Sequence, residues 1–258
     1  MKIIYPDIIT SVAADEENAA YPATNLQDNH PNKVWRATSR DAVVTVQVAA
    51  GANAVAVFSS NALTVSVSLY ETEESVEWNT GIEWDTNVEW FENSGAGPEY
   101  SVYDLSSSNE GAFWAEYATR YVPHQLTLTF TAAIGEIVEA GVIAAGASHS
   151  FNDPQYGIQE GLIDYSIIKK LANGAFYIKA QDVVRTFTGE ITLTRDSDFY
   201  TFMLDIARAL GPNPFACRIS TNVTNWEWVV YARFDGLPQG VHGYPDDSEI
   251  QFSLLEVL

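Results

Sequence analysis

The sequence contains very little cysteine and few basic residues, and each shortage excludes a class of protein. Cys217 is the single cysteine among 258 residues, so the chain cannot form an internal disulfide and does not depend on an oxidising compartment. Only 13 residues are Lys or Arg, against 34 that are Asp or Glu, which gives a formal charge of −21. Such a chain repels nucleic acid and anionic membrane surfaces, so we expect neither partner.

Long apolar runs are also missing. No run of about 18 apolar residues is present to span a bilayer, and the opening Met-Lys-Ile-Ile-Tyr-Pro has neither the apolar core nor the cleavage site of a signal peptide. The 12% aromatic content is nevertheless that of a folded chain. We therefore expect a soluble, folded protein that is assembled in a bacterial cytoplasm.

Short segments that alternate apolar and polar residues dominate the first half. They are Val43–Val48, Ala54–Phe58, Leu63–Leu69 and Gln125–Ala132. In the second half, strands are expected at Phe176–Ala180, Thr186–Leu193, Trp226–Phe234 and Ser248–Leu255, and a long apolar strand is expected before them at Ile137–Ala145. A period of two with many Val, Thr and Phe is typical of half-buried antiparallel strands, so the sequence predicts a mainly β protein of sandwich-like sheets.

One segment, at about 196–210, has helical rather than strand periodicity. Its apolar stripe consists of Phe199, Phe202, Met203, Ile206, Ala207 and Leu210. Asp196 or Ser197 can cap its start, and Gly211-Pro212 ends it. Small and polar residues near position 150 predict two domains, a β-sandwich at 1–150 and a second antiparallel β domain with this amphipathic helix at 151–258.

The segment Val76–Trp90 repeats a six-residue unit almost three times, as VEW-NTG-IEW-DTN-VEW. Its strict alternation places Trp78, Trp84 and Trp90 on one face of an extended chain and the intervening glutamates on the other. One long strand and three short strands joined by tight turns both satisfy this pattern. We interpret the region at about 71–113 as an insertion in the first domain.

Motifs for known chemistry are scarce. The four histidines occur in no nucleophile motif and are not spaced as zinc ligands, and no glycine-rich phosphate loop lies between a strand and a helix. They are His30, His124, His149 and His242. We therefore predict no catalytic residue and no enzyme activity.

Acidic residues suggest two further kinds of site. Glu77, Glu83 and Glu89 lie beside tryptophans, as in a glycosidase cleft, but in one strand they would face away from them, which favours a solvated acidic face. We expect no cofactor. Bound calcium is the alternative, although no EF-hand spacing supports it. Its candidate ligands are Asp15, Glu16 and Glu17, or Asp246 and Asp247. The three repeat tryptophans remain the candidate binding residues, for a protein interface or for a glycan.

Two stretches carry a resemblance to a known family. They read Tyr21-Pro22-Ala23-Thr24-Asn25-Leu26-Gln27-Asp28 and Val34-Trp35-Arg36-Ala37. Together they resemble the opening of the galactose-binding-like (discoidin-like) β-sandwich found in tail-associated proteins of tailed bacteriophages. The likeness continues through Arg120-Tyr121, Gln125–Phe130 and Glu136–Ala145. A weaker likeness to the second domain of the same proteins runs from Tyr156-Gly157 to the end of the chain.

The resemblance implies a non-enzymatic virion structural protein, located in the tail or tail tip and near host recognition. Its expected partners are other copies of itself and neighbouring tail proteins. Galactose-binding-like folds also occur in lectins, so a carbohydrate-binding module for host surface glycans is the alternative.

Overall fold

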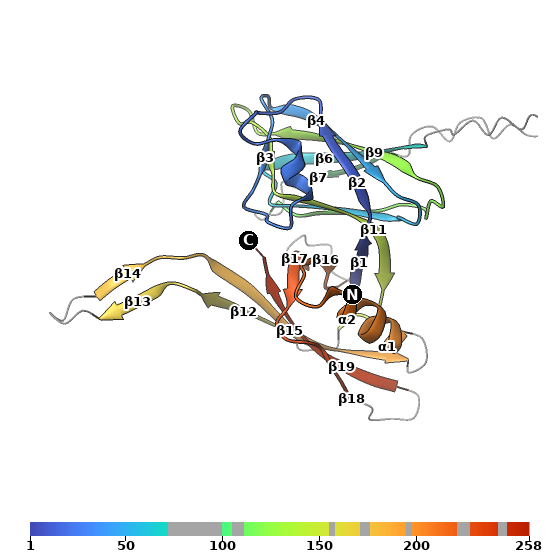
Figure 1. Ribbon diagram of the computed structural model, residues 1–258, viewed down its shortest axis with the longest axis vertical. Helices are drawn as coiled ribbons and strands as arrows, with labels where there is room; N and C mark the ends of the chain where they lie inside the picture. Colours follow the sequence, from blue (N-terminus) through green and yellow to red (C-terminus); the bar gives the residue numbers. More distant parts are fainter. Residues whose placement is uncertain are drawn as a thin grey trace, which may run out of the picture.

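The computed structural model is mainly β, with two large antiparallel sheets (Figure 1). It describes residues 1–71, 100–104, 111–154, 158–170, 176–194, 198–220, 228–241 and 247–257. The strands of the first half are β1 (Lys2–Asp7), β2 (Ile9–Ala14), β3 (Trp35–Arg36), β4 (Asp41–Val48), β5 (Ala54–Phe58), β6 (Ala62–Glu71), β7 (Tyr100–Asp104), β8 (Phe113–Glu116), β9 (His124–Ala132), β10 (Glu139–Ala140) and β11 (Val142–Ser150).

The second half continues the sheet and contains the helix. Its strands are β12 (Gln159–Asp164), β13 (Ile167–Lys170), β14 (Phe176–Lys179), β15 (Val183–Thr194), β16 (Phe215–Arg218), β17 (Val229–Phe234), β18 (Gln239–Val241) and β19 (Asp247–Glu256). The sequence-based expectation of a mainly β protein with sandwich-like sheets is confirmed. All the strands expected from alternation lie within or overlap these elements.

The first core lies between a five-stranded sheet, in the order β2-β4-β9-β6-β7, and the β11-β5-β8 end of the larger sheet. Strands β4 and β9 bury every second residue, which is the pattern that their alternating sequences predict. Trp35 is fully buried there and meets Phe130 edge to face, with ring centroids 5.6 Å apart.

The residues that carry the family resemblance form one corner of this sandwich. A 3₁₀ turn, η1 (Ala23–Gln27), buries Leu26 in the core, and the Asn25 amide donates to the Val34 carbonyl at 2.9 Å. The Arg36 guanidinium lies 4.4 Å from the centroid of the Tyr21 ring and binds Glu139 at 2.7 Å. These side chains therefore fix the turn against β3 and β10.

The larger sheet runs through both halves of the chain, in the order β12-β15-β19-β17-β16-β1-β11-β5-β8, with β18 on β19. Strand β1 joins them, because it pairs with β11 on one edge and with β16 on the other. Ile3 belongs to the second core, whereas Ile4 belongs to a third cluster with residues of β5, β11 and β17. The division into domains at residue 150 stays a prediction.

Two regions need separate comment. The expected strand Ile137–Ala145 is wrong as one element, because β10 ends at Ala140 and β11 begins at Val142. The break falls at Gly141, where an added Cβ would meet the backbone of Pro31, so a close approach of two chain segments interrupts the strand. The predicted insertion at 71–113 lies mostly outside the described residues, although β7, which lies within it, pairs with β6, which ends at its first residue.

The predicted helix is confirmed over Asp198–Leu210, as α1 (Asp198–Tyr200), a π-helical segment η2 (Thr201–Ala207) and α2 (Arg208–Leu210). Phe202 is fully buried in the second core and packs edge to face on Phe151 and Phe234. The helix ends at Gly211, whose φ of 55° is a conformation that glycine adopts without strain. No helix among the described residues is both long and apolar enough to cross a bilayer.

The junction between β1 and β11 contains a glycine with no room for a side chain. A Cβ at Gly146 would overlap the Pro6 carbonyl oxygen, where the register of the two strands shifts. We expect Gly146→Ala to lower the free energy of unfolding by about 2 kcal/mol through overpacking, measured by urea denaturation. Ser150→Ala, at an exposed position of the same strand, is the control and should have little effect. Equal stability of both variants would contradict this account of the junction.

Glu116 ties three strands of the same junction together. It binds Lys2 of β1 and accepts hydrogen bonds from the Trp114 indole at 3.3 Å and from the Ser148 hydroxyl of β11 at 3.1 Å. Partial burial opposes its ionisation, but the Lys2 ammonium and these donors outweigh that effect and lower the pKa of Glu116.

This pKa shift predicts a pH-dependent contribution to stability. Because the pKa is lower in the folded state than in the unfolded state, ionised Glu116 stabilises the fold near neutral pH, and the contribution is lost as the pH falls through the folded-state pKa. Glu116→Gln should therefore lower the unfolding free energy at pH 7, and its difference from wild type should shrink as the pH falls through the folded-state pKa. Denaturation at several pH values measures this difference. Glu136→Gln, at an exposed position, is the control, and a pH-independent effect of Glu116→Gln would contradict the assignment.

Candidate functional site

A two-stranded ribbon, which we call the arm, extends the larger sheet away from the body of the molecule (Figure 1). Its base is β12 paired with the start of β15, and its outer part is β13 paired with β14. Between them, the Gln181 backbone N–H donates to the Ser166 hydroxyl at 3.0 Å. We define the arm as the described residues 158–170 and 176–185, and its tip as 165–170 and 176–181.

The tip exposes large apolar side chains on both of its faces. Directly opposite residues of an antiparallel pair share a face, and the register therefore defines two sets. The apolar face comprises Ile168, Lys170, Phe176 and Ile178, and the lysine face comprises Ile167, Lys169, Tyr177 and Lys179. Phe176 and Ile178 are each 63% exposed and Tyr177 is 51% exposed. All eight of these side chains are exposed, so no described residue covers either face.

The tip also differs in charge from the rest of the molecule. The segment 165–181 contains three lysines and no acidic residue, although the chain has 34 acidic residues and only 13 basic ones. All three lysines are exposed. The tip is therefore a basic, apolar element on a strongly acidic protein, which is a combination that favours contact with another macromolecule.

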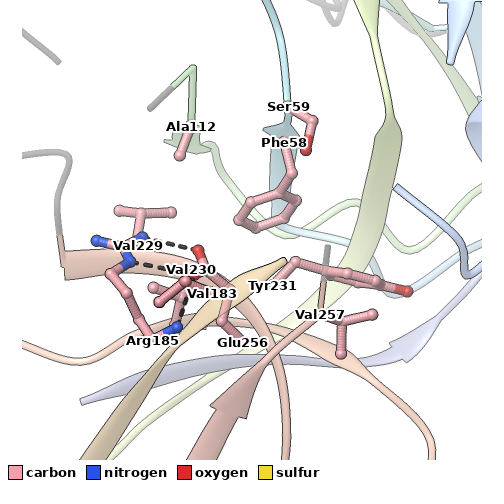
Figure 2. A pocket seen from close by; sticks show the side chains of 10 residues that line it. All are labelled: Phe58, Ser59, Ala112, Val183, Arg185, Val229, Val230, Tyr231, Glu256 and Val257. Carbon is pink, nitrogen blue, oxygen red and sulfur yellow. Dashed lines mark hydrogen bonds and ion pairs between the residues drawn. The ribbon is translucent and has the colours of Figure 1, made fainter. Parts of the chain in front are cut away.

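Two hollows lie at the base of the arm and share Glu256 and Val257. The first, of about 310 Å³, is lined by Phe58, Ser59, Ala112, Val183, Arg185, Val229, Val230, Tyr231, Glu256 and Val257 (Figure 2). The second, of about 610 Å³, is more open and lies beside Tyr165, Lys179 and Arg233. The first hollow is formed where the arm, β17 and the β5 end of the sandwich come together.

Arg185 and Glu256 form the principal ion pair of the first hollow, as Figure 2 shows. The Arg185 Nη2–Glu256 Oε1 distance is 2.8 Å and the Nε–Oε2 distance is 3.2 Å, so the contact is bidentate. The Arg185 backbone N–H also donates to Oε2 at 3.3 Å. Both side chains are largely buried, with 13% and 15% exposed. The pair therefore clamps the start of β15 to the end of β19.

Tyr231 closes the other side of this hollow. Its hydroxyl donates to the Asn29 side-chain oxygen at 2.9 Å, and its ring lies 5.3 Å from that of Phe58. Burial, with smaller contributions from the negative charges of Asp7 and Asp28, raises the pKa of Tyr231. The hydroxyl therefore stays protonated at neutral pH and serves as a structural donor, which links β17 to the loop after η1.

The candidate residues predicted from the sequence are not brought together by the described structure. Trp78, Trp84 and Trp90 lie outside the described residues, as do Glu77, Glu83, Glu89 and His242. The other histidines have separate partners. His124 is buried against the Tyr117 hydroxyl at 3.1 Å, His149 Nε2 lies 2.8 Å from the Tyr5 carbonyl oxygen, and His30 lies 3.9 Å from Asp28.

The candidate calcium ligands near the N-terminus, Asp15, Glu16 and Glu17, instead accept hydrogen bonds from other groups of the protein. Asp15 accepts from the Val43 N–H at 2.9 Å, and Glu17 accepts from the Ala23 N–H at 2.7 Å. Glu16 accepts from the Thr38 hydroxyl, also at 2.7 Å. In the part of the chain that the structure describes, no group of three His, Cys, Asp or Glu residues is close enough to hold a metal ion. Asp246 lies outside this part, and Asp247 begins β19.

Sequence reasoning missed the arm as a functional element. The sequence pattern predicted a strand at Phe176–Ala180 but none at Ile167–Lys170. It did not predict that either segment would be exposed. A signal was nevertheless present, because Asn173-Gly174 separates two short apolar runs, and this dipeptide is a strong indicator of a hairpin. The three lysines without any acid were a second signal.

Comparison with known proteins assigns no family, since no family model and no curated protein matches the sequence. The solved structures that are similar to part of the chain include the following two. Reduced XRCC1 bound to the DNA pol beta catalytic domain has 11% identity and a TM-score of 0.37, covering 57% of this chain and 99% of that one. A chitosan-binding module of a chitosanase/glucanase from Paenibacillus sp. IK-5 has 10% identity and a TM-score of 0.36, covering 55% and 98%. Likenesses at these TM-scores carry no argument about function.

The clamp at the arm base predicts a measurable coupling between two residues. In a double-mutant cycle of Arg185→Met and Glu256→Gln, we expect a coupling energy of about 1–3 kcal/mol, because the contact is bidentate and largely buried. Chemical denaturation of the four proteins measures it. A parallel cycle on the exposed pair Lys33 and Asp28 should give less than about 1 kcal/mol. Equal coupling energies in the two cycles would contradict the claim that the Arg185–Glu256 contact is stronger than an exposed ion pair.

Proposed function

We propose that this chain is a non-enzymatic structural subunit of a tailed-phage virion, a tail or tail-tip component that assembles through protein–protein contacts. The arm is the observation that carries the proposal. A two-stranded ribbon has no core of its own and is marginally stable in water, yet its tip exposes apolar side chains on both faces. Surfaces of this kind mark protein interfaces, and in an assembly the partner would supply the missing cover.

The position in a phage tail is supported by the resemblance of residues 21–28 and 34–37 to tail-associated sandwiches. Within the structure, these residues support the sandwich itself. Asn25 holds the chain after η1, and Arg36 bridges the Tyr21 ring and Glu139. That role agrees with a scaffold whose loops and arm make the external contacts. Its partners would be other copies and neighbouring tail proteins, and its location the virion.

The proposal is tested in the phage whose genome encodes this chain. Mass spectrometry of purified particles should detect the protein in the tail. A phage carrying Ile168→Thr, Phe176→Thr and Ile178→Thr, which removes the apolar face but keeps residues that favour strands, should assemble few infectious particles. The matched control is Tyr121→Thr with Val122→Thr, two exposed apolar positions outside the arm, and it should assemble normally.

Absence of the chain from purified particles would overturn the proposal, and normal assembly with the arm variant would remove its main support. Glycan binding by the purified protein that Trp84→Ala abolishes, together with normal assembly of the arm variant, would support the carbohydrate-binding alternative instead. That alternative stays a prediction from the sequence.

A further inference from the structure

The charge of the arm tip narrows the choice of its partner. Its three exposed lysines and the absence of acidic residues in 165–181 call for an acidic surface. The remainder of this same chain is such a surface, because it contains all 34 acidic residues and only ten basic ones. A second copy of the chain therefore has the charge that the tip requires.

An acidic patch of the required kind lies at the far end of the arm's own strand. Thr192 of β15, Glu249 of β19 and Val241 of β18 lie side by side in the ladder, and Glu190 lies two residues from Thr192 on the same face. The opposite face of this ladder carries Ile191, Ile250 and Leu193 in the second core. The patch therefore faces outward, and Val241 is 46% exposed within it. We call it the acidic patch, comprising Glu190, Glu249 and Val241.

Glu190 and Glu249 lie diagonally opposite each other on one face of adjacent strands, and their charges repel when both are ionised. A hydrogen bond between their side chains and the negative charge of Glu190 together raise the pKa of Glu249. Like charges on adjacent strands are unfavourable in an isolated molecule. An ammonium group from outside would relieve the repulsion, and the lysine face of the arm carries two ammonium groups, those of Lys169 and Lys179, with Tyr177 and Ile167 to cover Val241.

The arm cannot reach the acidic patch of its own molecule. Strand β15 is 12 residues long, with the arm continuing beyond Val183 and Glu190 lying in the opposite direction. A strand rises about 3.3 Å per residue, so the tip and the patch lie far apart in opposite directions along the same extended ribbon. Figure 1 shows β13 and β14 well away from β18, toward the opposite end of β15. A contact between them must therefore join two molecules.

We propose that the lysine face of the arm of one copy docks on the acidic patch of a second copy, in a head-to-tail contact. This inference deepens the proposed assembly role, on which it rests, by naming the partner and both contact surfaces. Because the two surfaces differ, each copy that receives an arm still offers its own, so the contact generates a ring or a filament.

The test uses the purified full chain and measures self-association by sedimentation velocity. Wild type should associate, and more weakly at high salt, since the contact joins opposite charges. Lys169→Glu with Lys179→Glu should raise the dissociation constant at least about tenfold. Lys170→Glu introduces the same kind of charge change on the apolar face, so it should have a much smaller effect. Circular dichroism checks that each variant is folded.

A mixing experiment tests the receiving surface. Glu190→Lys with Glu249→Lys should not self-associate, but it should associate when mixed with the Lys169→Glu, Lys179→Glu variant, because each then finds an opposite charge on the other. Wild type that stays monomeric, a Lys170→Glu effect as large as that of the lysine-face variant, or no recovery on mixing would each overturn the proposal. None of these results depends on whether the protein occurs in virions, so the two proposals can fail separately.

Discussion

The hydrogen bonding of β1 to both β11 and β16 is the interaction on which the rest of the structure depends. Without this six-residue strand, the sandwich and the second half would share no continuous sheet, since β11 and β16 do not pair with each other. Successive side chains of β1 point to opposite faces of the sheet, so Ile3 packs in the second core and Ile4 packs in the third cluster. The position of the arm relative to the sandwich is a consequence of this junction.

Much of the fold could be predicted because its strands have a local signal. In β4 and β9, one face meets the core and the other does not, so burial repeats the period of the sequence. The helix was equally evident from Phe199 to Leu210. The role of β1 was not, because its partners are distant in sequence and its short run of apolar residues resembles any buried segment. Pairings of this kind are set by tertiary context rather than by local propensity.

The candidate site could be predicted far less well, and the arm shows why. Phe176, Tyr177 and Ile178 have the composition of a buried strand, and hydrophobic patterning reads such residues as core. Their exposure follows from the position of β14, which pairs only with β13 among the described strands and therefore lies in a two-stranded sheet beyond the larger one. The sequence instead predicted binding residues in the tryptophan repeat, because the repeat is conspicuously regular. Its residues lie outside the described structure. The charge of the arm was a more informative signal than its hydrophobicity. A local excess of lysine on an acidic chain can be seen in the sequence without knowing which residues are buried.

Strand β15 also gives the molecule a mechanical property. It runs without interruption from the arm into the second core, and nine consecutive residue pairs, from Thr186 to Thr194, join it to β19. A pull along the arm axis would load these pairs in parallel, as shear, rather than opening them one after another. The bidentate Arg185 clamp lies at the end of the ladder where such a load would enter. Force applied to the arm would therefore be transmitted through this strand into the body of the molecule.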